Sequence, residues 1–331
     1  MSEALIVFLK TVSLFLLILV GWWARRRDYL TAETSRTLSR FVVDFTFPAL
    51  VFPQMLRTID PGVLRECWYF PVLAIGVLGL SEVVGLATMR FFCRQGEGPT
   101  FLFCIAMANW IYLPLPIVQG LYGDAGVRAV LLFNVGAQVF LWTAAVWTLR
   151  AAKPSVESAL WLAKNPGLIA TVLGIAFALW VPGAHTLHEA GPASGFPTRL
   201  CASVVEAMAL LGSLTIPLSF VVTGAQLGEL KLEHHRPSRA FMGVMVCRLA
   251  LAPIATVAAM VALAACGIVV PEVPRLTAYI IAAMPVAVSC SIITERLGGD
   301  TPLAARTIFY STFASILTMP VFVLVVRWGG W

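Results

Sequence analysis

The sequence contains little charge: only 12% of its 331 residues are Asp, Glu, Lys or Arg, whereas 59% are hydrophobic. A soluble domain usually carries about a quarter charged residues, which cover the surface that faces water. With so few charges and a mean hydropathy of +0.87, this chain has to present its outer surface to lipid. The composition therefore excludes a soluble enzyme or binding module and predicts an integral membrane protein.

Sequence patterns typical of several other functions are also absent. The seven cysteines include no Cys-x-x-Cys pair, so neither a disulfide framework nor a metal site is expected. The chain has no Gly-x-x-x-x-Gly-Lys-Ser/Thr phosphate loop, which argues against ATP-driven transport. Its net charge of +6 comes from basic residues in loops between apolar segments, so it predicts membrane orientation and no nucleic-acid partner.

Apolar segments of about 20 residues, the length needed to cross a bilayer, recur along the whole chain. The first is followed by three consecutive arginines, the reverse of the charge order in a signal peptide, so we expect it to remain as a membrane helix. Most Lys and Arg residues fall in one alternating set of loops, which predicts a cell-membrane protein with both termini on the non-cytoplasmic side. The ten predicted spans are 4–24, 37–57, 67–90, 100–120, 126–150, 166–182, 199–227, 238–266, 273–296 and 303–327.

Prolines recur at equal spacing in two pairs of spans. Pro48 and Pro217, in spans 2 and 7, are as far apart in sequence as Pro116 and Pro285, in spans 4 and 9. An interior proline removes a backbone hydrogen bond and interrupts a helix, so the spacing predicts two five-span repeats, the second inverted because five is odd. The alternative is ordinary kinks at coincidental spacing. The predicted all-α membrane protein thus has a first repeat, a cytoplasmic linker and a second repeat: 1–150, 151–165 and 166–331.

Span 4 carries the strongest helix-breaking sequence. Asn109 precedes Pro114 and Pro116, and two prolines so close together disfavour a continuous helix. Span 9 has its own break at Met284 and Pro285. Where two broken helices cross at mid-membrane, free N–H groups and positive helix ends converge and bind an anion without a lysine, while freed carbonyls are able to hold Na⁺. Alternatively, both breaks only shape the packing.

Polar residues inside spans are further candidates because each is costly in lipid. Asn134 and Gln138 lie one turn apart in span 5, where they either contact a substrate or tie the span to a neighbour. Arg248 and Glu82 lie at similar depths in spans 8 and 3, which predicts an ion pair that acts as a coupling switch or a structural lock. Asp44 in span 2 is a candidate protonation site.

Several short motifs, in order along nearly the whole chain, resemble the auxin efflux carrier family, whose bacterial branch includes malonate and malate permeases. They include Phe47-Pro48-Ala49-Leu50, the stretch from Asn109 to Pro116, Ile216-Pro217-Leu218, Ala283-Met284-Pro285 and Met319-Pro320. The resemblance implies a scaffold of spans 1, 2, 6 and 7, and a moving transport domain of spans 3–5 and 8–10 centred on the crossover of spans 4 and 9. It further implies that Asn109 and Gln138 contact a substrate carboxylate, and that spans 2 and 7 contribute to a homodimer.

The residues and the resemblance together predict a secondary active transporter that carries a small organic anion by elevator-like alternating access. We expect a mono- or dicarboxylate such as malonate, malate or an auxin-like acid, no cofactor, and coupling to H⁺ or Na⁺. No nucleophile–base pair lies at one depth, so we expect no enzymatic activity; a passive anion channel and an intramembrane enzyme are the rivals. Tyr112 and Pro114 depart from the family pattern and predict a smaller or more aromatic pocket. The predicted substrate-binding residues are Asn109, Tyr112, Leu113, Asn134, Gln138, Met284, Pro285 and Val286.

Overall fold

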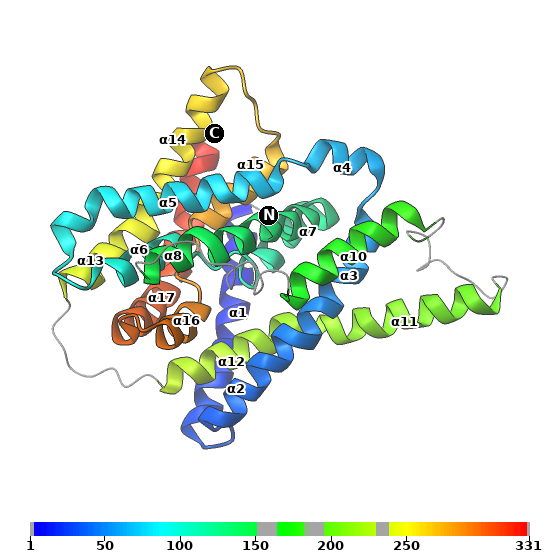
Figure 1. The fold of residues 1–331 in the computed structure, drawn as a ribbon, viewed down its shortest axis with the longest axis horizontal. Coiled ribbons are helices and arrows are strands. Elements are labelled where there is room, and N and C mark those ends of the chain that lie inside the picture. The colour runs from blue at the N-terminus through cyan, green and yellow to red at the C-terminus, as the bar shows by residue number, and fades with distance from the viewer. Residues whose placement is uncertain (1–2, 151–163, 182–183, 185–194, 230–237, 330–331) are drawn as a thin grey trace. The chain divides into compact units, whose positions relative to one another are not determined.

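The computed structural model describes residues 3–150, 164–181, 184, 195–229 and 238–329, whose regular secondary structure is helical (Figure 1). Contacts within the chain group the residues into two compact units, and each is described by itself. Unit 1 comprises Met1–Phe15, Phe70–Ala159 and Glu229–Trp331, and unit 2 comprises Leu16–Tyr69 and Leu160–Gly228. Each unit therefore combines helices from both predicted repeats. The repeat itself stays a prediction, and most of the predicted linker 151–165 lies outside the described residues.

Several helices in the described part of the chain are long and apolar enough to cross a membrane. They are Phe8–Arg26, Pro61–Phe92, Pro114–Arg150, Phe196–Glu229, Arg239–Ala265 and Thr301–Val326, and a shorter apolar helix covers Pro166–Trp180. The protein is therefore all-helical and has the helices of a multi-pass membrane protein. The segment that begins at Pro114 contains parts of predicted spans 4 and 5, because two helices meet there at a kink at Gly123, whose φ of 55° favours glycine.

Unit 2 contains α3 and the helices that pack against it, together with further helices of both predicted repeats. Its elements are the second part of α1 (Glu3–Arg26), α2 (Ala32–Phe41), η1 (Val42–Thr46), α3 (Phe47–Thr58), α4 (Pro61–Cys67), α10 (Pro166–Trp180), α11 (Phe196–Ser213) and α12 (Thr215–Glu229). Both α10 and α11 pack against α3, and glycines at the contacts leave room for its side chains and backbone.

Two prolines in unit 2 do not unwind their spans as the sequence suggested. Pro48 lies at the start of α3 and follows the π-helical turn η1, so the chain stays helical from α2 into α3. Pro217 lies in the first turn of α12, which only Leu214 separates from α11. In the first turn of α12 an N–H group has no acceptor within the helix, so Pro217 costs no hydrogen bond there, whereas Pro48 directly follows a π-helical turn in a continuous helical stretch.

Glycines allow α1 and α12 to approach closely within unit 2. A Cβ added at Gly21 would lie 1.9 Å from the backbone oxygen of Val221, and one at Gly224 would lie 1.9 Å from that of Ile18. Real Cβ atoms do not approach oxygen so closely, so both positions require glycine. This face of α12 is covered within the chain and is not available to a second copy.

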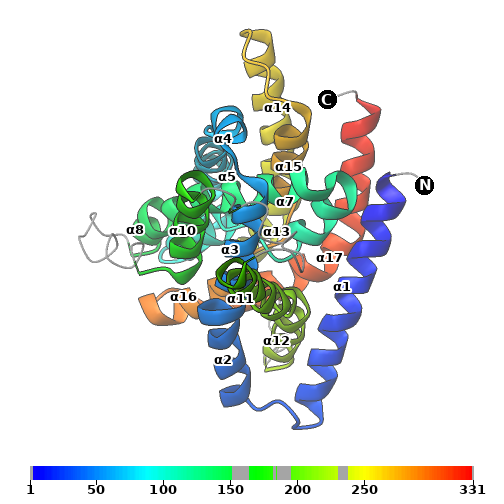
Figure 2. The ribbon, with the colours of Figure 1, turned by 90° about the vertical axis from the view of Figure 1, so that its right-hand side faces the viewer.

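Unit 1 contains the remaining elements. They are α5 (Phe70–Phe92), α6 (Gly98–Ala106), α7 (Pro114–Phe140), η2 (Leu141–Ala145), α8 (Val146–Arg150), α13 (Arg239–Val246), η4 (Cys247–Leu251), α14 (Ala252–Ala265), α15 (Glu272–Ala282), α16 (Ser289–Leu297) and α17 (Thr301–Trp328). α14 and α15 pack against each other as a hairpin that turns at Gly267 (Figure 2). Residues 100–108 of α6 and the chain after it are all buried, so this short helix forms the centre of the unit.

Candidate functional site

Two helices of unit 1 are interrupted. α6 ends at Ala106 and α7 begins at Pro114, whereas α15 ends at Ala282 and α16 begins at Ser289. The intervening residues 107–113 and 283–288 contain no helix. In the first segment, Pro114 occupies the first position of the new helix, where its missing N–H costs no hydrogen bond. The breaks leave backbone groups without intrahelical partners.

The two non-helical segments pair with each other as a short antiparallel bridge between Ala108 and Val286. The N–H of Asn109 donates to the carbonyl oxygen of Pro285 at 2.9 Å, and the N–H of Ala287 donates to the carbonyl oxygen of Met107 at 2.9 Å. The bridge satisfies groups that the breaks set free, as required where no water reaches the backbone. The residues that we predicted at the two breaks are therefore brought together.

A serine of α17, which was not among the predicted binding residues, supports the bridge from a third element. The N–H of Val286 donates to Oγ of the buried Ser311 at 3.2 Å. The predicted binding residues Met284, Pro285 and Val286 are themselves buried. They contribute backbone groups to the arrangement, which explains why no polar side chain in span 9 signalled the contact.

A cluster of amide groups lies next to the first break. Trp110, in the non-helical segment, donates its indole N–H to Oδ1 of Asn134 at 3.0 Å, and Nε2 of Gln138 donates to the same oxygen at 3.4 Å. The sequence left open whether Asn134 and Gln138 contact a substrate or a neighbouring segment. In the structure, the side-chain oxygen of Asn134 contacts a neighbouring segment. Its partner there is Trp110, which the sequence did not indicate.

The amide nitrogen of Asn134 takes no part in the hydrogen bonds of this cluster. An indole N–H only donates, so Asn134 has to present its oxygen to Trp110 and its NH₂ group elsewhere. Asn134 is fully buried, and Nδ2 has no hydrogen-bond partner among the described residues. A buried polar group without a partner costs about 1–3 kcal/mol and points to a site where a ligand or water completes the bonding.

Arg248 is fully buried and lies in the π-helical turn η4. Its Nε donates to the carbonyl oxygen of Met284 at 3.0 Å, Nη1 donates to that of Ile105 at 2.8 Å and to Oγ of Ser81 at 3.5 Å, and Nη2 donates to the carbonyl oxygen of Ala282. This guanidinium therefore binds the ends of both interrupted helices. A π-helical turn at such a position is common near functional sites.

The predicted ion pair between Arg248 and Glu82 is not what the structure shows. Glu82 accepts a hydrogen bond from Oγ1 of Thr148, whereas its neighbour Ser81 faces Arg248. Consecutive residues on a helix point about 100° apart, so only one of the two is able to face the arginine. The depth in the membrane was an insufficient guide because it says nothing about rotation around the helix axis.

The other predicted residues lie near the breaks or in unit 2. Tyr112, which is half-buried, and Leu113, which is buried, belong to the segment between α6 and α7, and the half-buried Pro116 lies in the first turn of α7. Asp44 is exposed and belongs to η1 of unit 2. The bonds described for the bridge, the amide cluster and Arg248 do not include Asp44.

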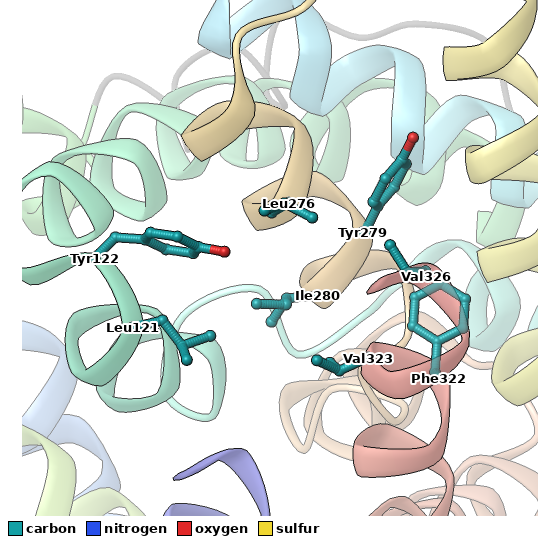
Figure 3. A pocket seen from close by; sticks show the side chains of 8 residues that line it. All are labelled: Leu121, Tyr122, Leu276, Tyr279, Ile280, Phe322, Val323 and Val326. Carbon is teal, nitrogen blue, oxygen red and sulfur yellow. The ribbon is translucent and has the colours of Figure 1, made fainter. Parts of the chain in front are cut away.

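An apolar cleft elsewhere in unit 1 is shown in Figure 3. Its volume is about 10 Å³, which is room for about one water molecule and too little for a carboxylate. A larger open hollow of about 460 Å³ lies where α5 ends, and Arg90 and Arg94 contribute positive charge to its lining. The residues lining the small cleft come from α7, α15 and α17: Leu121, Tyr122, Leu276, Tyr279, Ile280, Phe322, Val323 and Val326.

Apolar helices and two paired helix interruptions together define a multi-pass membrane protein of the kind that carries solutes. The chain belongs to the membrane transport protein family, whose model matches residues 6–159 and 154–323, and the resemblance to the auxin efflux carriers is thereby confirmed. It is similar to an uncharacterized transporter of Methanothermobacter thermautotrophicus, 22% identical over 321 residues that cover 95% of this chain and 97% of the relative. An uncharacterized transporter of Methanocaldococcus jannaschii is also 22% identical over 321 residues, 95% of each chain.

Proposed function

We propose that the protein is a secondary active transporter of a small organic anion, a mono- or dicarboxylate such as malonate, malate or an auxin-like acid. The observation that carries the proposal is the hydrogen-bonded bridge between the two interrupted helices. At this bridge α7 and α16 begin, and helix N-termini carry partial positive charge. Arg248 adds a full positive charge to the same region. An anion is the ligand that these charges favour.

The amide cluster supports a carboxylate in particular. A carboxylate has two acceptor oxygens, and the buried NH₂ group of Asn134 supplies donors that are not used within the described structure. Hydrogen bonds to a charged partner are about twice as strong as neutral ones. We propose that Asn134 donates to the substrate, with Asn109 and Gln138 as further contacts and the aromatic ring of Tyr112 restricting the size of the pocket.

The grouping of contacts supports an elevator-like mechanism. Unit 1 contains predicted spans 4, 5 and 8–10 and nearly all of span 3, including both breaks. Unit 2 contains spans 2, 6 and 7, and span 1 of the expected scaffold is divided between the two units. We propose ten spans in two inverted repeats, with unit 1 as the moving body and unit 2 as a scaffold that pairs with a second copy through spans 2 and 7. An ion gradient drives accumulation of the substrate.

The proposed topology predicts which cysteines an impermeant maleimide reaches on intact cells. Cys266, exposed at the end of α14, lies on the proposed outer side, and Cys93, after α5, lies on the proposed cytoplasmic side. We expect Cys266 to be labelled at once and Cys93 only after permeabilisation, as peptide mass spectrometry would show. Burial, and to a lesser extent Glu97, raises the pKa of the Cys93 thiol to about 11, so its labelling should accelerate with rising pH as more thiolate forms. Labelling of Cys93 on intact cells would refute the topology.

Carboxylate binding and accumulation test the function itself. We expect malonate, malate or a related acid to raise the melting temperature of the purified protein, because a ligand at 100 times its Kd stabilises by about 2.7 kcal/mol. The same acid should accumulate in proteoliposomes above its external concentration when an ion gradient is imposed. Equilibration without accumulation would indicate a channel, and chemical conversion of the acid in detergent would indicate an enzyme. Absence of both binding and flux for every acid tested would reject the proposal.

A further inference from the structure

The carbonyl groups freed at the two breaks are occupied by a side chain of the protein itself. Ile105 is the penultimate residue of α6, Ala282 is the last residue of α15, and Met284 follows in the break. The carbonyl oxygens of all three accept hydrogen bonds from the guanidinium of Arg248. The last carbonyls of a helix lack intrahelical partners and carry partial negative charge. One cationic side chain thus caps the C-terminal ends of both interrupted helices.

In transporters built on interrupted helices, such carbonyls and C-terminal helix ends coordinate the co-transported sodium ion. The guanidinium of Arg248 carries the same charge as Na⁺ but is covalently attached and cannot dissociate. Because like charges repel strongly at a few ångströms in a medium of low dielectric, it also excludes a sodium ion from the same carbonyls. We propose that Arg248 is a resident cation that takes the place of a coupling sodium ion, so that substrate binding is independent of Na⁺.

The charge of Arg248 is not cancelled by a carboxylate. Among the described residues its hydrogen-bond acceptors are three backbone carbonyls and the hydroxyl of Ser81, all of them neutral, and the carboxylate of Glu82 is bonded to Thr148 instead. Arg248 therefore brings its positive charge to the crossover with no carboxylate among its hydrogen-bond partners in the described residues. That charge offers an anionic substrate the compensation that Na⁺ would otherwise bring. The inference rests on the proposed carrier function and narrows its coupling ion.

The first experiment measures the melting temperature and the apparent malonate affinity of the wild-type protein in NaCl, KCl and choline chloride at equal ionic strength. We expect the same values in all three salts. Binding of a coupling ion and of substrate is reciprocal, with typical coupling of about 5–150-fold, so a sodium-coupled carrier would show a large difference. Sodium-specific stabilisation, or a sodium-specific gain in affinity of that size, would overturn the proposal.

The second experiment separates a resident cation from a structural lock. In Arg248→Ala the carbonyls lose their cation, and we expect a lower melting temperature that millimolar guanidinium or Na⁺ partly restores, at concentrations far below those that denature. Leu78→Ala is the matched control, because Leu78 is fully buried on α5 and its loss frees no carbonyl. We expect no restoration in the control. Arg248→Lys keeps the positive charge but has fewer hydrogen-bond donors. We expect its melting temperature to be lower than that of the wild-type protein and to stay unchanged when Na⁺ is added.

These outcomes distinguish the inference from the proposed function. If Arg248→Ala responds to no small cation, or responds no more than Leu78→Ala, Arg248 is only a lock and the inference fails. If Arg248→Ala does not fold, the wild-type salt comparison and a sodium response in Arg248→Lys still decide the question. If instead no carboxylate stabilises the wild-type protein in any salt, the proposed function fails, whereas cation-specific restoration of Arg248→Ala would still support the resident cation.

Discussion

Replacing Asn134 with leucine is expected to reduce carboxylate affinity by about 10–100-fold, because a hydrogen bond to a charged group contributes about 1.5–3 kcal/mol and each 1.4 kcal/mol is tenfold in Kd. Leucine has the same number and branching of side-chain heavy atoms but no donor, so Asn134→Leu removes the unused NH₂ group that we assign to the substrate. The affinity is read from the concentration dependence of the melting temperature, with the acid that gives the largest shift on the wild-type protein.

The stability of the same variant without ligand is as informative as its affinity. Asn134→Leu deprives the indole N–H of Trp110 of its acceptor, which is destabilising, but it also removes a buried amide nitrogen that lacks a partner among the described residues. The two effects oppose each other, so we expect a small change in melting temperature beside a large loss of affinity. If Asn134 only held α7 to the first break, its substitution would instead lower the melting temperature strongly and change the affinity little.

Trp110→Phe is the control for Asn134→Leu. It removes the indole donor and keeps the amide of Asn134, so the substrate contact stays possible although the amide is less well oriented. We expect a loss of affinity of less than about tenfold, since only orientation and no charged hydrogen bond is lost. If Asn134→Leu binds the carboxylate as tightly as the wild-type protein, the amide is not part of the site. If Trp110→Phe is the more damaging variant, the indole and not the amide contacts the ligand.

The features that the sequence predicted well are those that depend on neighbouring residues. Pro114 and Pro116 predicted an interruption of span 4, and α7 indeed begins at Pro114 after the non-helical residues 107–113. Pro48 and Pro217 look the same in the sequence and also lie in first turns, but a helical turn or a single residue separates their helices from the preceding ones. The difference lies in the length of the break before the proline, which the packing of other segments decides.

The contacts of the candidate site could not be predicted because they join residues that are distant in the sequence. Trp110 reaches Asn134 across a chain reversal, and Arg248 reaches carbonyls in two other helices, which no spacing rule describes. Backbone acceptors leave no signal in a sequence, since every residue has a carbonyl. An expectation of a carboxylate partner for a buried arginine therefore led to Glu82, whereas the structure uses the free ends of broken helices.

The second large effect that we expect is a loss of stability in Gly136→Ala, at the close approach of α5 and α7. A Cβ added at Gly136 would lie 1.9 Å from the carbonyl oxygen of Pro71, and 2.6 Å from its carbonyl carbon. Both are backbone atoms, so no side-chain rotation relieves the clash and the helices have to separate. Overpacking in a well-packed core costs about 1–3 kcal/mol and occasionally more, and we expect Gly136→Ala to lie at or above the upper end.

Gly76→Ala is the matched control for Gly136→Ala, because Gly76 is also helical, lies in the same unit and has nothing within 4 Å of an added Cβ. Alanine is favoured over glycine in a helix by about 1 kcal/mol, so this variant should melt at the same or a slightly higher temperature. Gly136 stands between Asn134 and Gln138 on α7, and separating α7 from α5 would displace both amides. Any Gly136→Ala protein that folds should therefore also bind the carboxylate more weakly. Equal stability of the two variants would show that α5 and α7 do not pack this closely.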